Sequence, residues 1–389
     1  MRGVYMKKVL YLGRFGLPES AAGIRVYRIA KLLSACGCRV RFGCYGSRYS
    51  KAAEIFDGYA YNFLIAHRGV GRMLNAADLY CDLIKYRFAR QLIQTYQPDM
   101  VILYNPTCHI ANMVRRYCRK LGISVVVDVT EWYEIAHCQK GEKVVARSVD
   151  KRIRTIDSKM DGIIAISPYL ADYYRKMGQR VYEIPPMMME IGRGDYSRSC
   201  SEDGALLTIV YAGLPGRKDQ LDQVLCAVEE INRDRVKIHL DVVGVSAENG
   251  TPGICFYGRL PHDKAVDVVR KADFSVLFRE NLRYAKAGFS TKFSESMSLG
   301  VPVICNSVGG CDALISSMQN GIVVEDGSIE TIRDCLLNLL EQPDTVLENM
   351  KKGAIQLAAE HFSFEVNQKT VNNMLADLIK GDGAKCCKE

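Results

Sequence analysis

AGFSTKFSESMSLGVPVI, residues 287–304, combines a predicted helix with the start of a strand. Gly288 precedes Ser290 and Thr291, residue types that suit a helix start, and Gly300 ends the helix before an apolar run over residues 301–305. A continuous apolar strand of this kind is typical of a parallel sheet that helices cover on both faces. The stretch therefore predicts an α/β unit with a polar loop and a helix start at one sheet edge.

The same alternation of strand and helix extends along the whole chain. Predicted strands occupy residues 8–12, 39–45, 100–104, 123–129, 162–166 and 181–184 in the first half, and 207–212, 237–243, 274–278, 301–305 and 321–324 in the second. Helical periodicity marks residues 24–35, 221–231, 263–270, 329–340 and 344–361. Repeated strand–helix–strand units predict an α/β protein with two Rossmann-like, doubly wound domains.

A domain boundary is predicted after Pro185 and Pro186, where a glycine-containing, polar stretch follows. We expect an N-terminal, acceptor-side domain over residues 1–190 and a C-terminal, donor-side domain over residues 191–361. Residues 362–389 predict an amphipathic helix and a tail that return to pack on the N-terminal domain. Because ligands of such sheets bind at the carboxyl ends of the strands, two facing domains predict a cleft between them.

Composition limits the class of protein. The 389 residues are 48% apolar and 25% charged, as in soluble globular proteins, and no apolar run approaches the roughly 18 residues of a membrane span. Residues 1–8 do not resemble a secretory signal, so a cytoplasmic location is expected, and Met6 is a second possible start. The net charge of +8 permits an anionic partner, but no dense basic run predicts nucleic-acid binding.

Cysteine usage favours a reduced chain without a metal. There are fifteen cysteines, an odd number at scattered positions, which argues against a disulfide framework. The chain has no CxxC motif, and its closest cysteine pairs, 36/38 and 386/387, lack histidine partners at zinc spacing. We therefore expect the cysteines to act mainly as small apolar residues.

Two loops of the second half are candidates for binding a diphosphate. In residues 287–304, the hydroxyls and N–H groups of Ser290 and Thr291 suit phosphate oxygens, and Lys292 shares a helix face with Glu295. The Glu295 carboxylate can accept two hydrogen bonds from the vicinal diol of a ribose. A surface Lys–Glu pair is the alternative interpretation.

The segment YAGLPGRKD, residues 211–219, ends a predicted strand with small residues and then presents adjacent cations. Gly213 allows a close backbone approach, while Arg217 and Lys218 suit a diphosphate clamp. A solvated basic turn remains the alternative.

Two loops of the first half are further candidates. The segment GRFGLPESAAGIR, residues 13–25, includes Gly23 and opens a helix, which favours an anion at the helix start, although a plain strand–helix turn is equally consistent. In VVVDVTEWYE, residues 125–134, the carboxylates of Asp128 and Glu131 lie at the end of a predicted strand beside Trp132. That aromatic ring suits either a sugar or a loop anchor.

Residues 295–303, ESMSLGVPV, resemble the most distinctive motif of the retaining GT-B glycosyltransferases of the glycosyltransferase group 1 kind. Residues 213–218, 258–260, 272–277, 308–310 and 320–324 are also similar to that family, as are 16–23, 165–167 and 184–186. Ala287 stands where the family has the first glutamate of a pair, and Asp128 ends a strand that often ends in histidine. The STKFSE form resembles a subgroup common in bacterial surface polysaccharide assembly.

The resemblance implies a retaining, metal-independent enzyme that moves a sugar from a UDP- or GDP-sugar to a saccharide or polyprenyl-diphosphate-linked acceptor in polysaccharide biosynthesis. The donor is a substrate, and no further cofactor is implied. The ribose is expected to bind Glu295. The diphosphate is expected to bind Gly23, Gly213, Arg217, Lys218, Ser290, Thr291 and Lys292. Lys218 and Lys292 are expected to stabilise the leaving group, with Asp128 or Glu131 orienting hydroxyls of the donor or acceptor.

The acceptor side is less specific. Residues 69–94 mix cations with aromatic and aliphatic residues, which is consistent with a packed helix or with a face that contacts an anionic membrane. A peripheral position at the inner face of the membrane is therefore one expectation. Two other functions remain open, a GT-B nucleotide-sugar epimerase and a sugar-nucleotide-binding protein without catalytic activity.

Overall fold

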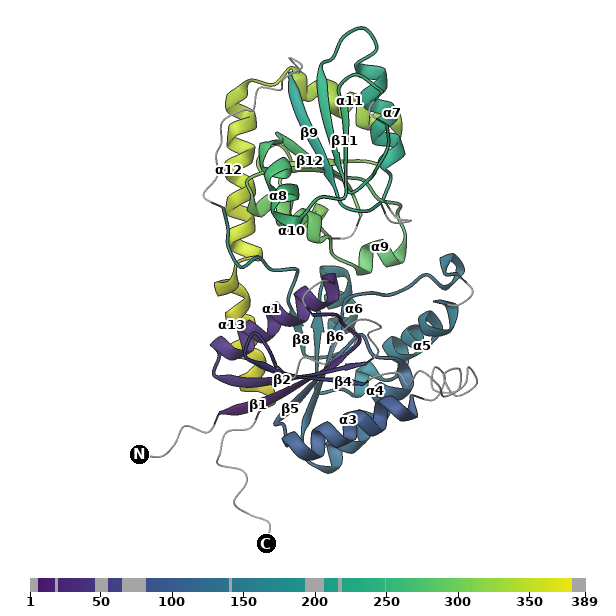
Figure 1. Cartoon of the computed structure of the whole chain (residues 1–389), viewed down its shortest axis with the longest axis vertical. Coiled ribbons are helices and arrows are strands. Elements are labelled where there is room, and N and C mark those ends of the chain that lie inside the picture. Colours follow the sequence, from purple (N-terminus) through teal and green to yellow (C-terminus); the bar gives the residue numbers. More distant parts are fainter. Residues whose placement is uncertain are drawn as a thin grey trace. The chain divides into compact units, whose positions relative to one another are not determined.

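The computed structural model describes residues 6–17, 20–45, 55–64, 82–139, 142–192, 206–215, 219–248, 250–308 and 310–379. The chain forms two compact units, each with its own sheet (Figure 1). One unit comprises Met1–Pro185 and Asn367–Glu389, and the other comprises Pro186–Val366.

In the described part of the N-terminal unit, an eight-stranded sheet has the order β3-β4-β2-β1-β5-β6-β7-β8. All neighbouring strands are parallel except β3 and β4, which form an antiparallel pair. The strands are β1 (Lys7–Gly13), β2 (Cys38–Tyr45), β3 (Ile55–Phe56), β4 (Tyr59–Leu64), β5 (Met100–Tyr104), β6 (Ser124–Val129), β7 (Gly162–Ala165) and β8 (Val181–Glu183). The central strands β1, β5 and β6 are almost entirely buried, which explains their continuous apolar sequences.

Helices cover both faces of this sheet (Figure 1). The described helices are α1 (Ala21–Ala35), α3 (Leu83–Tyr96), α4 (Cys108–Lys120), α5 (Glu142–Thr155), α6 (Pro168–Lys176) and α13 (Phe364–Leu378), with short 3-10 turns η1 (Ile135–His137) and η2 (Asp157–Lys159). Helix α13 packs against this sheet, because Ser124 Oγ donates to the Leu378 carbonyl at 2.6 Å and the Tyr182 hydroxyl donates to Asp377 at 2.8 Å. The last turns of the chain's final described helix therefore belong to the N-terminal unit.

The C-terminal unit contains a six-stranded, all-parallel sheet in its described part, with the order β11-β10-β9-β12-β13-β14. Its strands are β9 (Leu207–Ala212), β10 (Ile238–Val243), β11 (Ile254–Gly258), β12 (Phe274–Leu277), β13 (Val303–Asn306) and β14 (Gly321–Val324). Its helices are α7 (Leu221–Ile231), α8 (His262–Lys271), α9 (Arg283–Ala287), α10 (Thr291–Ser298), α11 (Ile329–Leu340) and α12 (Asp344–His361), with the 3-10 turn η3 (Asp312–Leu314).

The core of the C-terminal unit has two sides. On one side, alternate residues of β9 and β10 pack with the apolar faces of α7 and α11 in a single large cluster. On the other side, Val210 packs against Val269 and Ala272, at the end of α8. A sheet covered on both faces is the arrangement that the continuous apolar runs predict.

The predicted fold class is confirmed: the chain forms two doubly wound α/β units. Each predicted strand is present to within two residues, and the predicted helices 221–231, 329–340 and 344–361 have the observed bounds. The sequence reasoning missed β3 and β11, which are edge strands of the described sheets, and β4, which lies between β3 and β2. Among the described residues, no helix has both the length and the apolar character needed to cross a bilayer.

The strand order positions the candidate site. In each sheet the chain reverses the direction in which it adds strands, between β1 and β5 in the N-terminal unit and between β9 and β12 in the C-terminal unit. At such a switch point, the loops that leave the two central strands diverge and leave room for a ligand at the carboxyl ends.

Candidate functional site

The cluster of polar side chains at the β9/β12 switch point is the candidate site of the C-terminal unit. Gly213 follows β9, Arg279 lies two residues beyond β12, and α10 begins at Thr291. Asp219 and Arg279 pair in an isolated antiparallel bridge, which ties the loop after β9 to the loop after β12. The carboxyl ends of two adjacent strands and one helix start thus meet around Asp219.

Lys292 is held from two directions in this cluster. Its Nζ donates to Asp219 Oδ2 at 2.9 Å and to the Tyr211 hydroxyl at 2.7 Å, and it lies 4.0 Å from the centroid of the Tyr211 ring. The Tyr211 hydroxyl also donates to Asp219 Oδ2, at 2.9 Å. The ammonium group therefore has a fixed position next to Gly213 and the start of α10.

Arg279 forms the other half of the cluster. Its Nε donates to Asp219 Oδ1 at 3.3 Å, and Nη2 donates to Ser290 Oγ at 3.1 Å. The Arg279 backbone N–H donates to Asn306 Oδ1, and Asn306 Nδ2 donates to the Arg279 carbonyl. Two cations, Arg279 and Lys292, thus share the single carboxylate of Asp219, so that the cluster has a net positive charge.

The pKa values agree with a shared carboxylate between two cations. Burial raises the pKa of Asp219, but attraction from Lys292 and Arg279 outweighs this and leaves that pKa below its usual range. Burial lowers the pKa of Lys292, and Asp219 only partly offsets the effect. A second anion beside Lys292 would stabilise its charged form, which is how a diphosphate would act.

Gly213 has a conformation that other residues rarely adopt, with φ of +132°, and a Cβ atom at this position would lie 2.5 Å from Lys292 Cε. The glycine therefore makes room for the lysine. Ser290 is buried at the N-cap position of α10, while Thr291 is exposed and Glu295 is partly buried one turn later. The predicted clamp residues Arg217 and Lys218 lie outside the described residues.

In the N-terminal unit, the predicted anion loop is closely packed on itself. Ser20 caps α1: its Oγ accepts from Gly23 N at 2.9 Å and donates to the Gly16 carbonyl at 3.0 Å. A Cβ atom at Gly23 would lie 1.8 Å from the Gly16 carbonyl oxygen. The need for glycine at this position is thus already explained by packing within the loop, and its contact with a diphosphate stays a prediction.

Asp128 lies in a buried ion pair. Its carboxylate, with an exposed fraction of 0%, accepts two hydrogen bonds from Arg25 Nε at 3.1 Å, one from Arg25 Nη2 at 2.7 Å and one from the Tyr11 hydroxyl at 2.5 Å. Arg25 Nη1 also donates to the Ile184 carbonyl at 2.8 Å. This geometry supports a structural role for Asp128 within the N-terminal unit, and a direct contact with substrate hydroxyls stays a prediction.

Glu131 and Trp132 differ in exposure. Glu131 is exposed and accepts a hydrogen bond from the Tyr133 hydroxyl. The Trp132 ring is buried, packs against Tyr173 with a centroid separation of 4.6 Å, and donates from Nε1 to Asp150 at 2.8 Å. Of the two interpretations of this tryptophan, the structure favours the loop anchor.

Sequence reasoning missed Tyr211, Asp219 and Arg279 as members of the site. Tyr211 and Asp219 lie at the two ends of the segment that predicts Gly213, Arg217 and Lys218, but neither carries a positive charge. Arg279 directly follows the predicted strand 274–278. Its place at a strand end, where ligands of parallel sheets bind, was the available signal.

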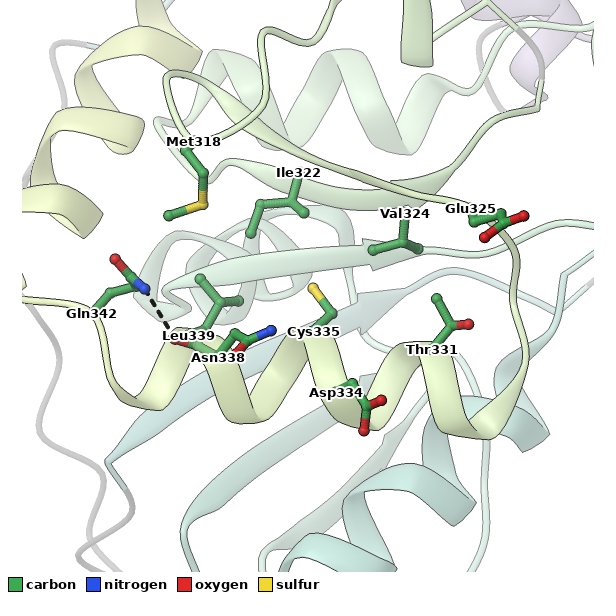
Figure 2. A pocket seen from close by; sticks show the side chains of 10 residues that line it. All are labelled: Met318, Ile322, Val324, Glu325, Thr331, Asp334, Cys335, Asn338, Leu339 and Gln342. Atoms are coloured by element: carbon green, nitrogen blue, oxygen red, sulfur yellow. Dashed lines mark hydrogen bonds between the residues drawn. The ribbon is translucent and has the colours of Figure 1, made fainter.

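A pocket of about 410 Å³ lies elsewhere in the C-terminal unit, between β14 and α11 (Figure 2). In Figure 2, side chains from α11 point upward toward Ile322 and Val324 of β14, and Met318 closes one end. The lining residues are Met318, Ile322, Val324, Glu325, Thr331, Asp334, Cys335, Asn338, Leu339 and Gln342. None of the candidate site residues lines this pocket, so it is separate from the Lys292 cluster.

Three known proteins show what the chain is similar to. An uncharacterized glycosyltransferase of Methanocaldococcus jannaschii is 23% identical over 173 residues, which is 43% of this chain and 40% of that protein. The sucrose-phosphate synthase of Thermosynechococcus elongatus superposes with a TM-score of 0.70 at 14% identity, covering 96% of this chain and 99% of that chain. HepE of Anabaena, solved with UDP and glucose, gives a TM-score of 0.68 at 15% identity, covering 96% and 100%.

These structural likenesses concern the fold, because all are below 25% identity. The family models add the sequence relationship. The model described as Glycosyltransferase Family 4 matches residues 22–187, and the model described as Glycosyl transferases group 1 matches residues 207–342, which contain the whole Asp219 cluster. With one model on each α/β unit and the whole fold shared with solved glycosyltransferases, the chain belongs to the group 1 glycosyltransferases and has their two-domain GT-B fold.

Proposed function

We propose that the protein transfers a sugar from a nucleotide diphosphate sugar to a saccharide or lipid-linked saccharide, with retention of the anomeric configuration. The observation that carries the proposal is the position of Lys292, held by Asp219 and Tyr211 at the start of α10 and the end of β9. A fixed cation and a helix start favour a diphosphate at this point. HepE, which shares the fold, was solved with UDP and glucose, so UDP is the first nucleotide to test.

The same cluster supports a mechanism without a metal ion. When the bond between the sugar and the diphosphate breaks, negative charge develops on the leaving phosphate oxygens. Lys292, together with the predicted Arg217 and Lys218, would stabilise that charge, and Ser290 and Thr291 would contribute N–H and hydroxyl donors. Glu295, one turn into α10, would accept hydrogen bonds from the ribose. The departing phosphate can take the acceptor's proton, so that no strong protein base is needed.

The direct test is incubation with UDP- and GDP-sugars and candidate acceptors, with the product analysed by NMR for its anomeric configuration. A new glycosidic bond with the donor's configuration, formed at the same rate with and without EDTA, supports the proposal. Formation of the opposite anomer would overturn retention. Loss of activity in EDTA would overturn metal independence, and donor conversion to an isomer without an acceptor would identify an epimerase instead.

One observation favours a second candidate, a sugar-nucleotide-binding protein without catalytic activity. Ala287, at the place of the first glutamate in the family motif, is fully buried at the end of α9. No carboxylate is available from this position. Under this alternative, UDP or GDP raises the melting temperature in a thermal-shift assay, while no acceptor in a broad panel is ever glycosylated.

For the acceptor, we propose a lipid-linked saccharide of polysaccharide assembly, met at the cytoplasmic face of an anionic membrane. The support comes from α3 and α4, which pack against each other in the N-terminal unit and contain no Asp or Glu. Their cations are Lys85, Arg87, Arg90, Arg115, Arg116, Arg119 and Lys120. The predicted segment 69–94 overlaps α3, and its residues 69–81 lie outside the described residues.

These two helices also expose apolar and aromatic groups near the cations. Leu83, Ile84 and Leu121 are exposed by 55%, 43% and 51%, and the Arg90 guanidinium lies 5.3 Å from the centre of the Tyr117 ring. Burial, followed by repulsion from the neighbouring Arg119 and Arg116, lowers the pKa of Arg115, and attraction from Asp161 only partly offsets this. Anionic headgroups would relieve this repulsion, and the exposed aliphatic groups would enter the interface.

Sedimentation with vesicles tests the membrane proposal. Vesicles with anionic lipid should bind the protein at low salt, and the double substitution Arg116→Ala and Arg119→Ala should reduce binding severalfold. Replacement of the exposed Lys264 on α8 of the other unit is the matched control and should have no effect. Equal sedimentation with neutral and anionic vesicles, or none with either, would remove the membrane contact.

A further inference from the structure

Three potential metal ligands meet on the sheet of the C-terminal unit, away from the Lys292 cluster. They are His239 and Asp241 on β10 and Cys255 on β11, and their ligand atoms all lie within 4.8 Å of one another. His239 and Asp241 are two residues apart, so they project from the same face of β10. Asp241 pairs directly with Cys255 across the parallel β10–β11 ladder. The register of two strands therefore brings the three side chains together.

The geometry is close to that of a tetrahedral metal site. With zinc–ligand bonds of about 2.0–2.3 Å, two tetrahedral ligand atoms stand about 3.3–3.6 Å apart. His239 Nε2 and Asp241 Oδ1 are 3.1 Å apart, and no two ligand atoms of the group are more than 4.8 Å apart, so the more distant atoms would have to move closer together on binding. The side chains of His239 and Asp241 are 17% and 9% exposed, so that a cation entering here would be partly shielded from water.

The chemistry of the donor set selects the cation. A thiolate and an imidazole are ligands of zinc, whereas magnesium and calcium prefer oxygen ligands alone. We propose that His239 Nε2, a carboxylate oxygen of Asp241 and the thiolate of Cys255 bind one Zn²⁺, with water in the fourth position. On binding, the Cys255 thiol releases its proton to solvent and its sulfur electron pair forms the bond to the metal.

The site would fasten the edge of the sheet. Strand β11 is the last strand on its side, and its ladder with β10 shifts register between Val242 and Val243. Zinc would join β11 to β10 through side chains. His239 lies opposite Thr208 near the start of β9, whereas the Lys292 cluster follows the end of that strand, so the inference is independent of the proposed sugar transfer.

Cobalt substitution tests the site directly. The Cys386→Ser, Cys387→Ser variant is used as the parent, so that the vicinal pair in the C-terminal sequence does not bind metal. Reduced, chelator-treated protein titrated with Co²⁺ should develop a thiolate-to-cobalt charge-transfer band that saturates at one equivalent. Cys255→Ser should lose the band, and His239→Ala should weaken Co²⁺ binding roughly tenfold or more. Cys226→Ser, which changes an exposed cysteine of α7, should leave the charge-transfer band unchanged.

A second measurement needs no substitution in the cluster, and so does not depend on the folding of the variants. The parent protein is treated with iodoacetamide with and without one equivalent of Zn²⁺, and the modified peptides are quantified by mass spectrometry. Zinc should protect Cys255 but not Cys226, and a weakly buffered titration should release about one proton per metal bound. Equal alkylation of Cys255 with and without zinc, or an unchanged cobalt band in Cys255→Ser, would overturn the proposal.

Discussion

The backbone of Gly213 lies so close to Lys292 that a Cβ atom at this glycine would stand 2.5 Å from Lys292 Cε. No other residue type could replace Gly213 without displacing the Lys292 side chain or straining the backbone, because the φ angle at this position is +132°. The turn after β9 and the first turn of α10 are thus fitted to each other. If Lys292 binds the diphosphate, this fit is a requirement of the site rather than of the fold alone.

Gly213→Ala should therefore weaken nucleotide binding. The added methyl group displaces the Lys292 side chain from Asp219 and Tyr211, so we expect UDP or GDP affinity to fall roughly thirtyfold, as for loss of one charge-assisted contact of about 2 kcal/mol. Isothermal titration calorimetry measures the change. Gly250→Ala is the matched control, because a Cβ at Gly250 meets nothing within 4 Å. Equal nucleotide affinities for Gly213→Ala and Gly250→Ala would show that nucleotide binding does not require Lys292 to keep its observed position.

Replacement of the lysines themselves tests the clamp. Lys292→Ala and Lys218→Ala should each slow sugar transfer roughly tenfold or more, because each removes a cation from the developing charge of the leaving group. Lys264→Ala, on the exposed face of α8, should transfer at the parent rate. Steady-state rates at saturating acceptor provide the measurement. Parent rates in both clamp variants would contradict the assignment of the diphosphate site.

The acidic residue of the cluster should matter for stability as well as binding. Asp219→Asn leaves Arg279 and Lys292 buried without their shared carboxylate, which we expect to lower the free energy of unfolding by on the order of 3 kcal/mol. Urea unfolding followed by circular dichroism measures this. Asp222→Asn, at an exposed position in the first turn of α7, should cost less than about 1 kcal/mol, the usual contribution of an exposed carboxylate at a helix start. If Asp219→Asn were equally harmless, the ion pairs would contribute nothing net to the fold.

How well the sequence predicted each strand depends on how fully that strand is buried. The central strands β1, β5, β9 and β10 are buried on both faces, so their apolar runs could be recognised without other information. Strand β4 reads YAYNFL, in which Asn62 interrupts the aromatic residues, and β11 is a short edge strand that ends in glycine. In both strands most residues are only partly buried, so their sequences carry a weaker apolar signal.

The candidate site was predictable only in part, for a similar reason. Gly213, Ser290 and Lys292 stand in motifs whose residue types suggest phosphate binding, and they do lie together. Asp219 and Arg279 are 60 residues apart in sequence, and their pairing depends on the order of β9 and β12 in the sheet. Asp128 is the opposite case. Its position at a strand end predicts that its carboxylate binds a ligand, but in the structure this carboxylate pairs with Arg25, which is 103 residues away in the sequence.

An experiment can distinguish a structural role of Asp128 from a catalytic one. Because its buried carboxylate holds Arg25 and Tyr11, Asp128→Asn should lower the free energy of unfolding by on the order of 3 kcal/mol. Asp172→Asn, which changes an exposed carboxylate on α6, should cost less than about 1 kcal/mol. A large loss of kcat with unchanged stability in Asp128→Asn would instead support the predicted contact with substrate hydroxyls.

The lowered pKa of Lys292 gives a pH dependence with a definite sign. The charged ammonium binds the diphosphate, and burial shifts its pKa below the usual 10.5, so its charge is lost at a lower pH than for an exposed lysine. Nucleotide affinity should therefore fall as the pH rises toward 10. Lys292→Arg keeps its charge throughout this range and should remove that fall, while effects of the nucleotide's own titration remain in both proteins. Calorimetric titrations at several pH values compare the parent protein with Lys292→Arg. If nucleotide affinity fell with pH in the same way in both proteins, loss of charge at Lys292 would not be the cause.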